Sequence, residues 1–193
     1  MAKMGHLLKR ATRISPGEKG FTLAELVVAI GLSALFTGLI LAALASSRQV
    51  CTSVTADQDL QQTANVIMDK IIKGSAESGI TYRLSEATTY SIVAIDELDF
   101  KDIGDSSWRA YFLTQSSTGT ELWYRRPIAG VAGAVLIYKA PIGTTLTLRF
   151  WPLGGPAYTN ITVGIDVGLS KTVNGRTVTG SATTMINIRN HAT

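Results

Sequence analysis

Charged residues are scarce in this sequence, and their distribution argues against one broad class of function. Only 17% of the 193 residues are charged, whereas 46% are hydrophobic. The net charge of +4 comes from residues 1–20, which hold five basic residues and one acid and leave 13 of each sign beyond them. A protein that binds the phosphate backbone of a nucleic acid needs its positive charge on the folded part of the chain. We therefore expect no nucleic-acid partner.

Cysteine and histidine are also nearly absent. Cys51 is the only cysteine, so no intrachain disulfide can form, and we interpret it as a helix-surface or interface residue, with an intermolecular disulfide as the alternative. Beyond residue 20 the only histidine is His191, near the end of the sequence, where a packed catalytic site is not expected. No residue spacing suits zinc. The sequence therefore predicts neither an enzyme nor a cofactor.

One long apolar run dominates the N-terminal part of the chain. The 25 residues from Phe21 to Ala45, FTLAELVVAIGLSALFTGLILAALA, contain a single charge, at Glu25. As a helix they would extend roughly 37 Å, enough to cross a hydrocarbon core of ~30 Å with some tilt. The basic residues before the run predict that this end stays in the cytoplasm.

Two common kinds of apolar segment are alternatives. A secretory signal has a shorter apolar core, although Ala43-Leu44-Ala45 resembles its small-x-small cleavage site. An ordinary single-pass anchor gives no reason for Glu25, because a carboxylate in a membrane helix is costly and marks function. A cut between Gly20 and Phe21 would supply a reason, since it creates a positive amine one helical turn before the carboxylate. Between staggered chains, such a desolvated pair would favour one stagger over others.

The stretch Gly20-Phe21-Thr22-Leu23-Ala24-Glu25, followed by the apolar run to Ala45, resembles the class III leader and N-terminal helix of type IV pilins and type II secretion pseudopilins. The resemblance implies that prepilin peptidase cuts after Gly20, that Phe21 is then N-methylated, and that Glu25 sets subunit registration. It also implies a bacterial inner-membrane protein with its C-terminal domain in the periplasm. Its other partners would be pilin or pseudopilin subunits, contacted through their N-terminal helices in a periplasmic or surface filament.

The rest of the chain is expected to form an α+β, pilin-like fold. After Ala45, apolar residues recur on one face at Val50, Val54, Ala64, Ile67, Met68, Ile71 and Ile72, and no proline interrupts Phe21 to Lys73. We predict one helix of about 50 residues, stopped at Gly74 and packed through its second half on an antiparallel sheet. The expected segments are a leader (1–20), a transmembrane and assembly half-helix (21–45), an amphipathic half-helix (46–74) and a β-rich periplasmic domain (75–193).

Beyond Gly79 the apolar period changes to two, which is typical of strands. The expected strands are Tyr90–Ala94, Glu97–Phe100, Arg109–Thr114, Glu121–Arg126, Ala134–Lys139, Thr145–Trp151, Asn160–Val167 and Thr183–Arg189. Asn174-Gly175 predicts a two-residue type I′ hairpin turn. Trp123-Tyr124 and Arg125-Arg126 either form a partner patch or are strand residues that face alternate sides, and we favour the second interpretation.

The layout, and a final strand over residues 185–190, are most similar to the J-type pseudopilin or the W-type minor pilin. The helix proline and C-terminal cysteine pair of many major pilins are missing, whereas Glu25 argues against the K-type tip subunit. The sequence thus predicts a minor subunit of a type II secretion pseudopilus or a type IV pilus, in a tip or initiation complex. The alternative is a membrane-anchored exported enzyme or binding domain that does not polymerise.

An acidic stretch at residues 96–105 raises the question of calcium. The candidate ligands are Asp99, Asp102 and Asp105, because calcium prefers oxygen ligands. However, Glu97 and Asp99 alternate with apolar residues, which fits the wet face of a strand, and no EF-hand spacing is present. We therefore predict no metal site.

Overall fold

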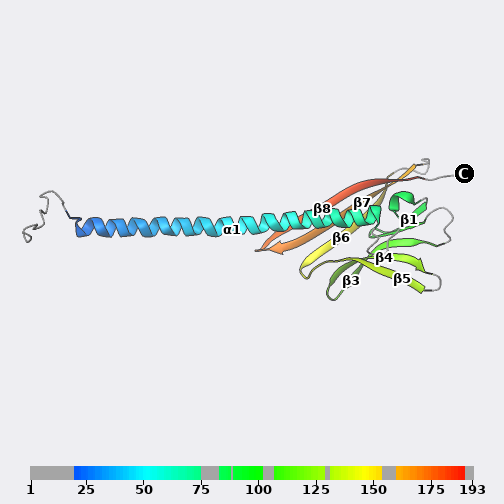
Figure 1. The fold of residues 1–193 in the computed structure, drawn as a ribbon, viewed down its shortest axis with the longest axis horizontal. Helices are drawn as coiled ribbons and strands as arrows, with labels where there is room; N and C mark the ends of the chain where they lie inside the picture. The colour runs from blue at the N-terminus through cyan, green and yellow to red at the C-terminus, as the bar shows by residue number, and fades with distance from the viewer. Residues whose placement is uncertain are drawn as a thin grey trace, which may run out of the picture. The chain divides into compact units, whose positions relative to one another are not determined.

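The computed structural model describes residues 20–74, 83–87, 89–101, 107–128, 131–153 and 160–189. It contains helix α1 (Leu23–Lys73), a short 3-10 helix η1 (Leu84–Glu86) and eight strands: β1 (Thr89–Ala94), β2 (Glu97–Lys101), β3 (Arg109–Ser116), β4 (Gly119–Ile128), β5 (Val131–Lys139), β6 (Thr144–Leu153), β7 (Asn160–Val173) and β8 (Arg176–Arg189) (Figure 1). This is the α+β fold that the sequence predicts, a long N-terminal helix packed on antiparallel sheet.

Helix α1 ends where the sequence predicts it to end. Its last residue is Lys73, and Gly74 follows with a φ of 73°, a left-handed conformation that glycine adopts without strain. The hydroxyl of Tyr111 donates a hydrogen bond of 3.2 Å to the Ile71 carbonyl, one of the last carbonyls without a partner inside the helix. The end of α1 is therefore fixed both by its backbone and by a buried side chain of β3.

The chain divides into two compact units, Met1–Ser47 and Arg48–Thr193. In the first unit every described side chain is exposed, including the whole apolar run from Phe21 to Ala45. In the second unit the remainder of α1 packs with the sheets around a common core. The two parts of one continuous helix thus have different environments.

Two antiparallel sheets build the second unit. Strands β1 to β5 follow one another as a meander, and β6, β7 and β8 form a separate three-stranded sheet. The Phe150 N–H donates a hydrogen bond of 2.8 Å to the Ile95 carbonyl, which joins β6 to the turn between β1 and β2. Side chains on β6 alternate as predicted, with Leu146 and Leu148 buried between exposed neighbours.

The hairpin of β7 and β8 has the predicted turn but longer strands than expected. Asn174 and Gly175 have φ angles of 52° and 76°, as a type I′ turn requires. The strands continue from Asn160 to Val173 and from Arg176 to Arg189, so the sequence prediction ended β7 six residues early and began β8 seven residues late. The glycines that resemble turn signals here occupy strand positions where another chain segment comes close.

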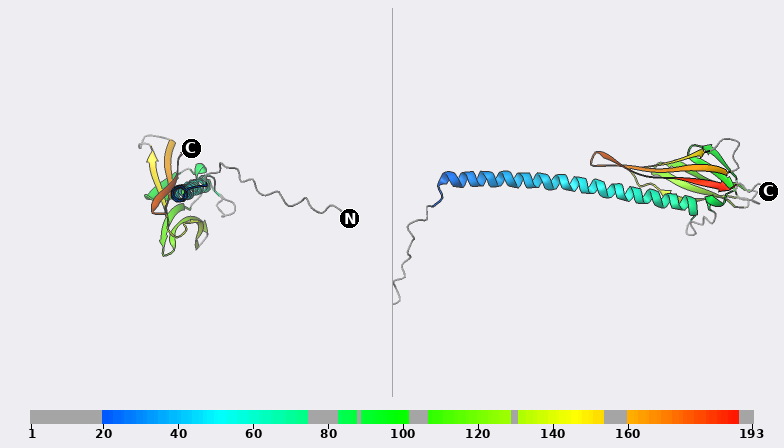
Figure 2. Two further views of the ribbon diagram at one scale, coloured as in Figure 1. Left: turned by 90° about the vertical axis from the view of Figure 1, so that its left-hand side faces the viewer. Right: turned by 90° about the horizontal axis from the view of Figure 1, so that it is seen from above.

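Gly180 shows why a glycine is needed inside β8. A Cβ atom at this position would lie 2.4 Å from the backbone nitrogen of Gln61, so β8 passes directly against α1. Next to this contact, the Gln61 side-chain amide donates to the Ser181 carbonyl at 2.6 Å and accepts from the Ser181 N–H at 3.1 Å. Figures 1 and 2 show β8 running beside the C-terminal part of α1. The helix therefore covers β8 at Gly180 and Ser181, and β8 is an edge strand of its sheet.

The buried face of α1 differs in part from the predicted one. Its buried residues are Leu60, Ala64, Ile67, Met68 and Ile71, and Ile72 is partly buried. Val50 and Val54 were expected on this face, but they remain 56% and 50% exposed. They precede the part of the helix that the sheets cover, which begins near the partly buried Ala56. The prediction was therefore wrong for these two valines.

Candidate assembly site at the start of helix α1

The backbone around the predicted cleavage bond is open. Gly20 and Phe21 lie before the first helical residue, both are exposed, and the Phe21 side chain is 88% exposed. A Cβ atom at Gly20 would meet no other atom within 4 Å. The bond between these residues thus lies outside the hydrogen-bonded helix, and no side chain among the described residues covers it.

Glu25 makes hydrogen bonds that the sequence analysis did not foresee. Its Oε2 atom accepts from the Thr22 backbone N–H at 2.9 Å and from the Thr22 hydroxyl at 3.0 Å, while the Glu25 N–H donates to Thr22 Oγ1 at 3.2 Å. This reciprocal arrangement is a capping box, which satisfies backbone groups at the first turn of a helix. The signal was present in the sequence as Thr followed three residues later by Glu, at the start of an apolar run.

The capping box holds the carboxylate at one end of an apolar helix surface. Around Glu25 this surface is formed by Ala24, Val28, Ala29 and Leu32, which are exposed apolar residues on the same side of the first turns. Only one carboxylate oxygen takes part in the capping bonds. Among the described residues, none forms a hydrogen bond with the second oxygen, Oε1.

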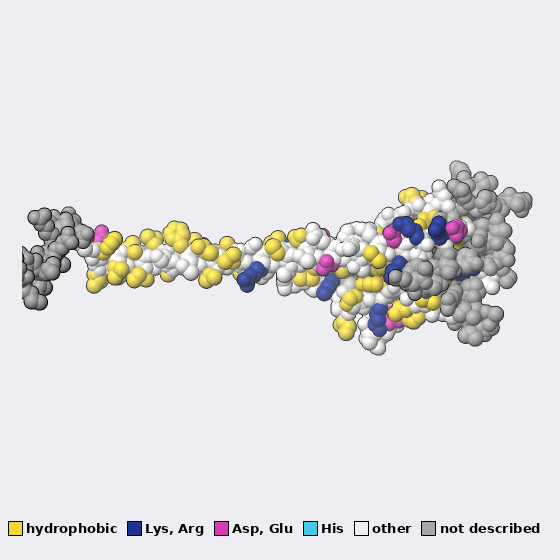
Figure 3. All heavy atoms as spheres, in the orientation of Figure 1, with side chains coloured by type: hydrophobic (Ala, Val, Ile, Leu, Met, Phe, Trp, Pro, Cys, Tyr) yellow, Lys and Arg dark blue, Asp and Glu magenta, His cyan; other side chains and the backbone are white. Residues whose placement is uncertain are grey.

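The first half of α1 has the properties of a membrane anchor. Among the described residues, α1 is the one helix long and apolar enough to cross a membrane, and its apolar stretch packs on nothing in the structure. Figure 3 shows hydrophobic side chains all along this part of the helix. Its hydroxyls are satisfied locally, because Ser33 donates to the Ala29 carbonyl and Thr37 to the Ser33 carbonyl, each at 2.8 Å. Lipid would therefore meet no unsatisfied hydroxyl at either position.

Of the three candidate calcium ligands, Asp102 and Asp105 lie outside the described residues. Asp99 lies on β2, and its Oδ1 atom is buried with no hydrogen-bond partner among the described residues. Desolvation raises the pKa of Asp99, and the nearby charge of Arg125 opposes this shift. In the described part of the chain, no three side chains of histidine, cysteine, aspartate or glutamate gather as metal ligands would.

Trp123, Tyr124 and Arg125 point to alternate sides of β4, as the favoured interpretation predicts. Tyr124 is buried, whereas Trp123 and Arg125 are partly exposed. The Arg125 guanidinium lies 4.8 Å from the centre of the Phe112 ring and 3.5 Å from Glu97, so it is part of a cross-strand cluster. The side chain of Arg126 lies outside the described residues.

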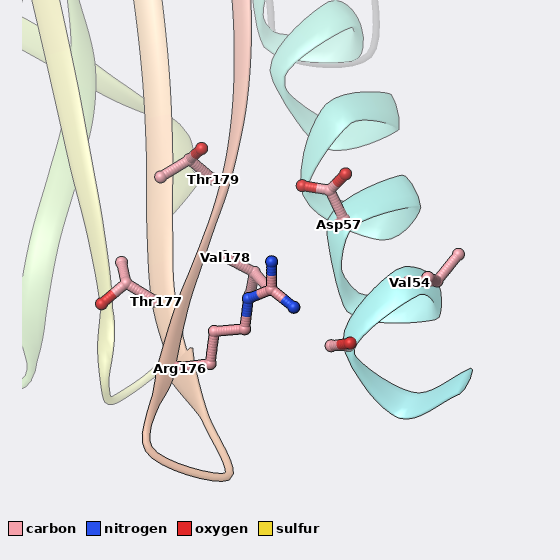
Figure 4. A pocket seen from close by; sticks show the side chains of 7 residues that line it. Val54, Asp57, Arg176, Thr177, Val178 and Thr179 are labelled. Carbon is pink, nitrogen blue, oxygen red and sulfur yellow. The ribbon is translucent and has the colours of Figure 1, made fainter. Parts of the chain in front are cut away.

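A shallow pocket of about 270 Å³ lies between α1 and the start of β8 (Figure 4). Ser53, Val54 and Asp57 line it from the helix, and residues 176–179 line it from the strand. Arg176 extends from β8 toward the helix in Figure 4. Cys51 is exposed on α1 nearby in the chain. The lining holds no histidine or cysteine, so the pocket presents none of the usual nucleophile and base pairs.

Comparison of the chain with protein-family models, with curated proteins and with solved structures found no match. The resemblance to the pilin-like family therefore depends on the residues from Lys19 to Ala45 and on the order of helix and strands.

Proposed function

We propose that this chain is a minor pseudopilin or minor pilin, a structural subunit rather than an enzyme. Prepilin peptidase would cut it after Gly20, and Phe21 would be methylated. The processed subunit would remain in the inner membrane until it is assembled into a filament. The observation that carries this proposal is the position of Glu25: a lone carboxylate at the start of an exposed apolar helix, five residues after an open Gly20–Phe21 bond.

The apolar half of α1 supports assembly as well as anchoring. A helix with apolar side chains on every side must be covered by lipid or by other apolar helices. A filament built from several such helices would replace the lipid with neighbouring subunits. Each carboxylate would then lie in an apolar bundle, where a charge without a partner is strongly unfavourable. The ammonium that cleavage creates at Phe21 of a neighbouring subunit would neutralise it.

The capping box also favours a second candidate function. Because Thr22 already satisfies one oxygen of Glu25, the carboxylate has a structural role within its own chain. An anchored exported domain that never polymerises could keep Glu25 for this role alone. The two candidates differ in whether Glu25 is needed only for the start of the helix or also for contact between chains.

Substitution of Glu25 in the native host separates them. In Glu25→Ala, removal of one member of a buried charge pair should reduce co-purification with filament subunits at least about tenfold, since such losses cost ~3–5 kcal/mol. Membrane insertion and cleavage after Gly20 should persist. Asp57→Asn is the matched control, because Asp57 is an exposed carboxylate on the same helix beyond the apolar run. Unchanged assembly of Glu25→Ala would favour the anchored domain.

A further inference from the structure

The three-stranded sheet has one face on the core and an outer face that carries small polar side chains. Side chains with odd numbers on β6 and β8, and with even numbers on β7, point away from the core and form this outer face. Register partners on the three strands line up as rows across the sheet. Hydroxyl side chains are frequent in these rows, for example Thr145, Thr147, Ser170, Thr179 and Ser181.

Trp151 is the one aromatic side chain on the described part of the outer face. It lies over Gly164, its register partner on β7, because a Cβ atom at Gly164 would collide with the indole. The nearest ring atom to that Cβ would be Cε2, and the bonded neighbours Nε1 and Cζ2 would both be further away. A point beside the ring edge would be closer to one of those neighbours. The indole therefore rests on the glycine with one face and directs its other face away from the sheet.

Polar side chains border the indole in the two neighbouring rows. In one row Arg149 and Asp166 are register partners, and the Thr183 hydroxyl donates a hydrogen bond of 2.8 Å to Asp166 Oδ1. In the other row the Thr162 hydroxyl donates a hydrogen bond to Asn187 Oδ1. Rows on one face of a strand are about 7 Å apart. Oriented donors and acceptors thus lie on both sides of one aromatic ring.

The charge and the apolar area of the outer face narrow the class of partner. Among its described side chains Arg149 is the one cation and Asp166 the one anion, so they leave no net charge; the side chain of Arg189 lies outside the described residues. Beside the indole, the exposed apolar side chains of this face are Met185 and Leu153. A stable protein interface needs a larger apolar centre, and a nucleic acid needs excess cations. The face suits a neutral ligand with a flat apolar side and hydroxyl groups at its edges.

We propose that the outer face of the β6–β7–β8 sheet binds a β-1,4-linked glycan chain, with one pyranose ring stacked on Trp151. Equatorial linkages make such a chain a ribbon, which has C–H groups on its two faces and hydroxyl groups along its edges. The electron-rich face of an indole attracts C–H groups, and the edge hydroxyls would pair with Arg149, Asp166 and Asn187. All of these residues belong to the unit Arg48–Thr193, so the binding does not require filament assembly.

The test uses the full chain in detergent micelles whose headgroups contain no sugar, with ¹⁵N-labelled tryptophan. The chain has three indole N–H groups, those of Trp108, Trp123 and Trp151, and the spectrum of Trp151→Phe identifies the last. Cellohexaose is the hydroxyl-bearing probe and chitohexaose the N-acetylated one. We expect at least one of them to shift the Trp151 signal with a dissociation constant of ~1 mM. Trp108 is the internal control, because it is 42% exposed but lies outside this face.

Variants separate stacking from hydrogen bonding, with affinities measured from the NMR signals of the glycan itself. Trp151→Ala should weaken binding at least about tenfold, whereas Trp151→Phe keeps a ring and should retain most of the affinity. Arg149→Gln/Asn187→Ala leaves the indole in place and should weaken binding about fivefold, which tests the proposal even if Trp151→Ala does not fold. Trp108→Ala and Arg176→Gln are the matched controls, because they change exposed residues away from the outer face.

Several results would overturn the glycan site. They are a Trp151 signal that moves with neither probe, an equal shift at Trp108, and equal binding of maltohexaose, whose α-1,4 linkages curl the chain. Unchanged affinity in both Trp151→Ala and Arg149→Gln/Asn187→Ala would assign the glycan to another surface. None of these results bears on cleavage after Gly20, so the glycan site can fail while the proposed function stands.

Discussion

Thr22 has two roles in the first turn of α1, as donor to the Glu25 carboxylate and as acceptor for the Glu25 N–H. We predict that Thr22→Val loosens this turn, because a capping side chain contributes ~1 kcal/mol. Thr22→Ser should keep the turn intact. Hydrogen exchange of the Glu25 amide in detergent micelles measures the effect, expected as roughly fivefold faster exchange. The control is Thr37→Val, which removes a hydroxyl bond within the helix. Equal exchange in Thr22→Val and wild type would contradict the capping role.

Asp99 gives a prediction about pH. Desolvation raises the pKa of its carboxyl, so the folded chain still holds the proton at a pH where the unfolded chain has released it. This favours the folded state below the ordinary carboxyl pKa of about 4, and the contribution is lost as the pH rises through the folded-state pKa. We therefore expect Asp99→Asn to gain stability relative to wild type as the pH rises above the ordinary carboxyl pKa of about 4.

Denaturant unfolding at several pH values measures this difference, with Asp57→Asn as the control at an exposed carboxylate. The opposite trend, in which wild type gains on the variant as the pH rises, would show that the charged form of Asp99 has a stabilising partner. A calcium ion would be such a partner, and its addition would then stabilise wild type but not Asp99→Asn.

At the scale of elements, the contact between β8 and α1 leads to a prediction about Gly180. In Gly180→Ala the new methyl group would lie 2.4 Å from backbone atoms of Leu60 and Gln61, which cannot rotate away. Strand and helix would have to move apart, and overpacking of this kind costs roughly 1–3 kcal/mol. Denaturant unfolding followed by tryptophan fluorescence measures the loss.

Gly168→Ala is the matched control for Gly180→Ala. There the new methyl group meets mainly the Thr147 hydroxyl, at the end of a side chain that can rotate. We expect a smaller loss of stability. Equal stability of wild type and Gly180→Ala would contradict the close approach of β8 to the helix.

The elements show which features the sequence could predict. Helix α1 was predictable because its apolar pattern is long and Gly74 marks its end. The Asn174-Gly175 turn was predictable because few other dipeptides suit a type I′ turn. The extra length of β7 and β8 was not predictable from the sequence. Gly168 and Gly180 resemble strand ends unless the neighbouring chain segment is known. The exposure of Val50 and Val54 also depends on where the sheets end, which a helical period cannot reveal.

Only part of the candidate site was predictable from the sequence. The Gly20–Phe21 bond and Glu25 stand out because a carboxylate is unusual in an apolar run. The bonds between Thr22 and Glu25 were not predicted, although the sequence holds the Thr-x-x-Glu spacing of a local cap. A lone carboxylate at the start of an apolar helix can thus have a partner within its own first turn.

At the scale of the whole molecule, the two units need different surroundings. Residues 21–45 expose apolar side chains that require lipid or other apolar helices, whereas Arg48–Thr193 contains its own core. In the proposed function, lipid surrounds the apolar part of the helix before assembly, and neighbouring subunits surround it afterwards. It depends on a proteolytic step that frees the Phe21 amine.

The most direct test is therefore the N-terminus of the mature protein, purified from native membranes and analysed by intact mass and N-terminal fragment sequencing. The account predicts a chain that begins with N-methylated Phe21 and retains everything after it. A chain that still begins at Met1, or one that begins just after Ala45, would contradict it.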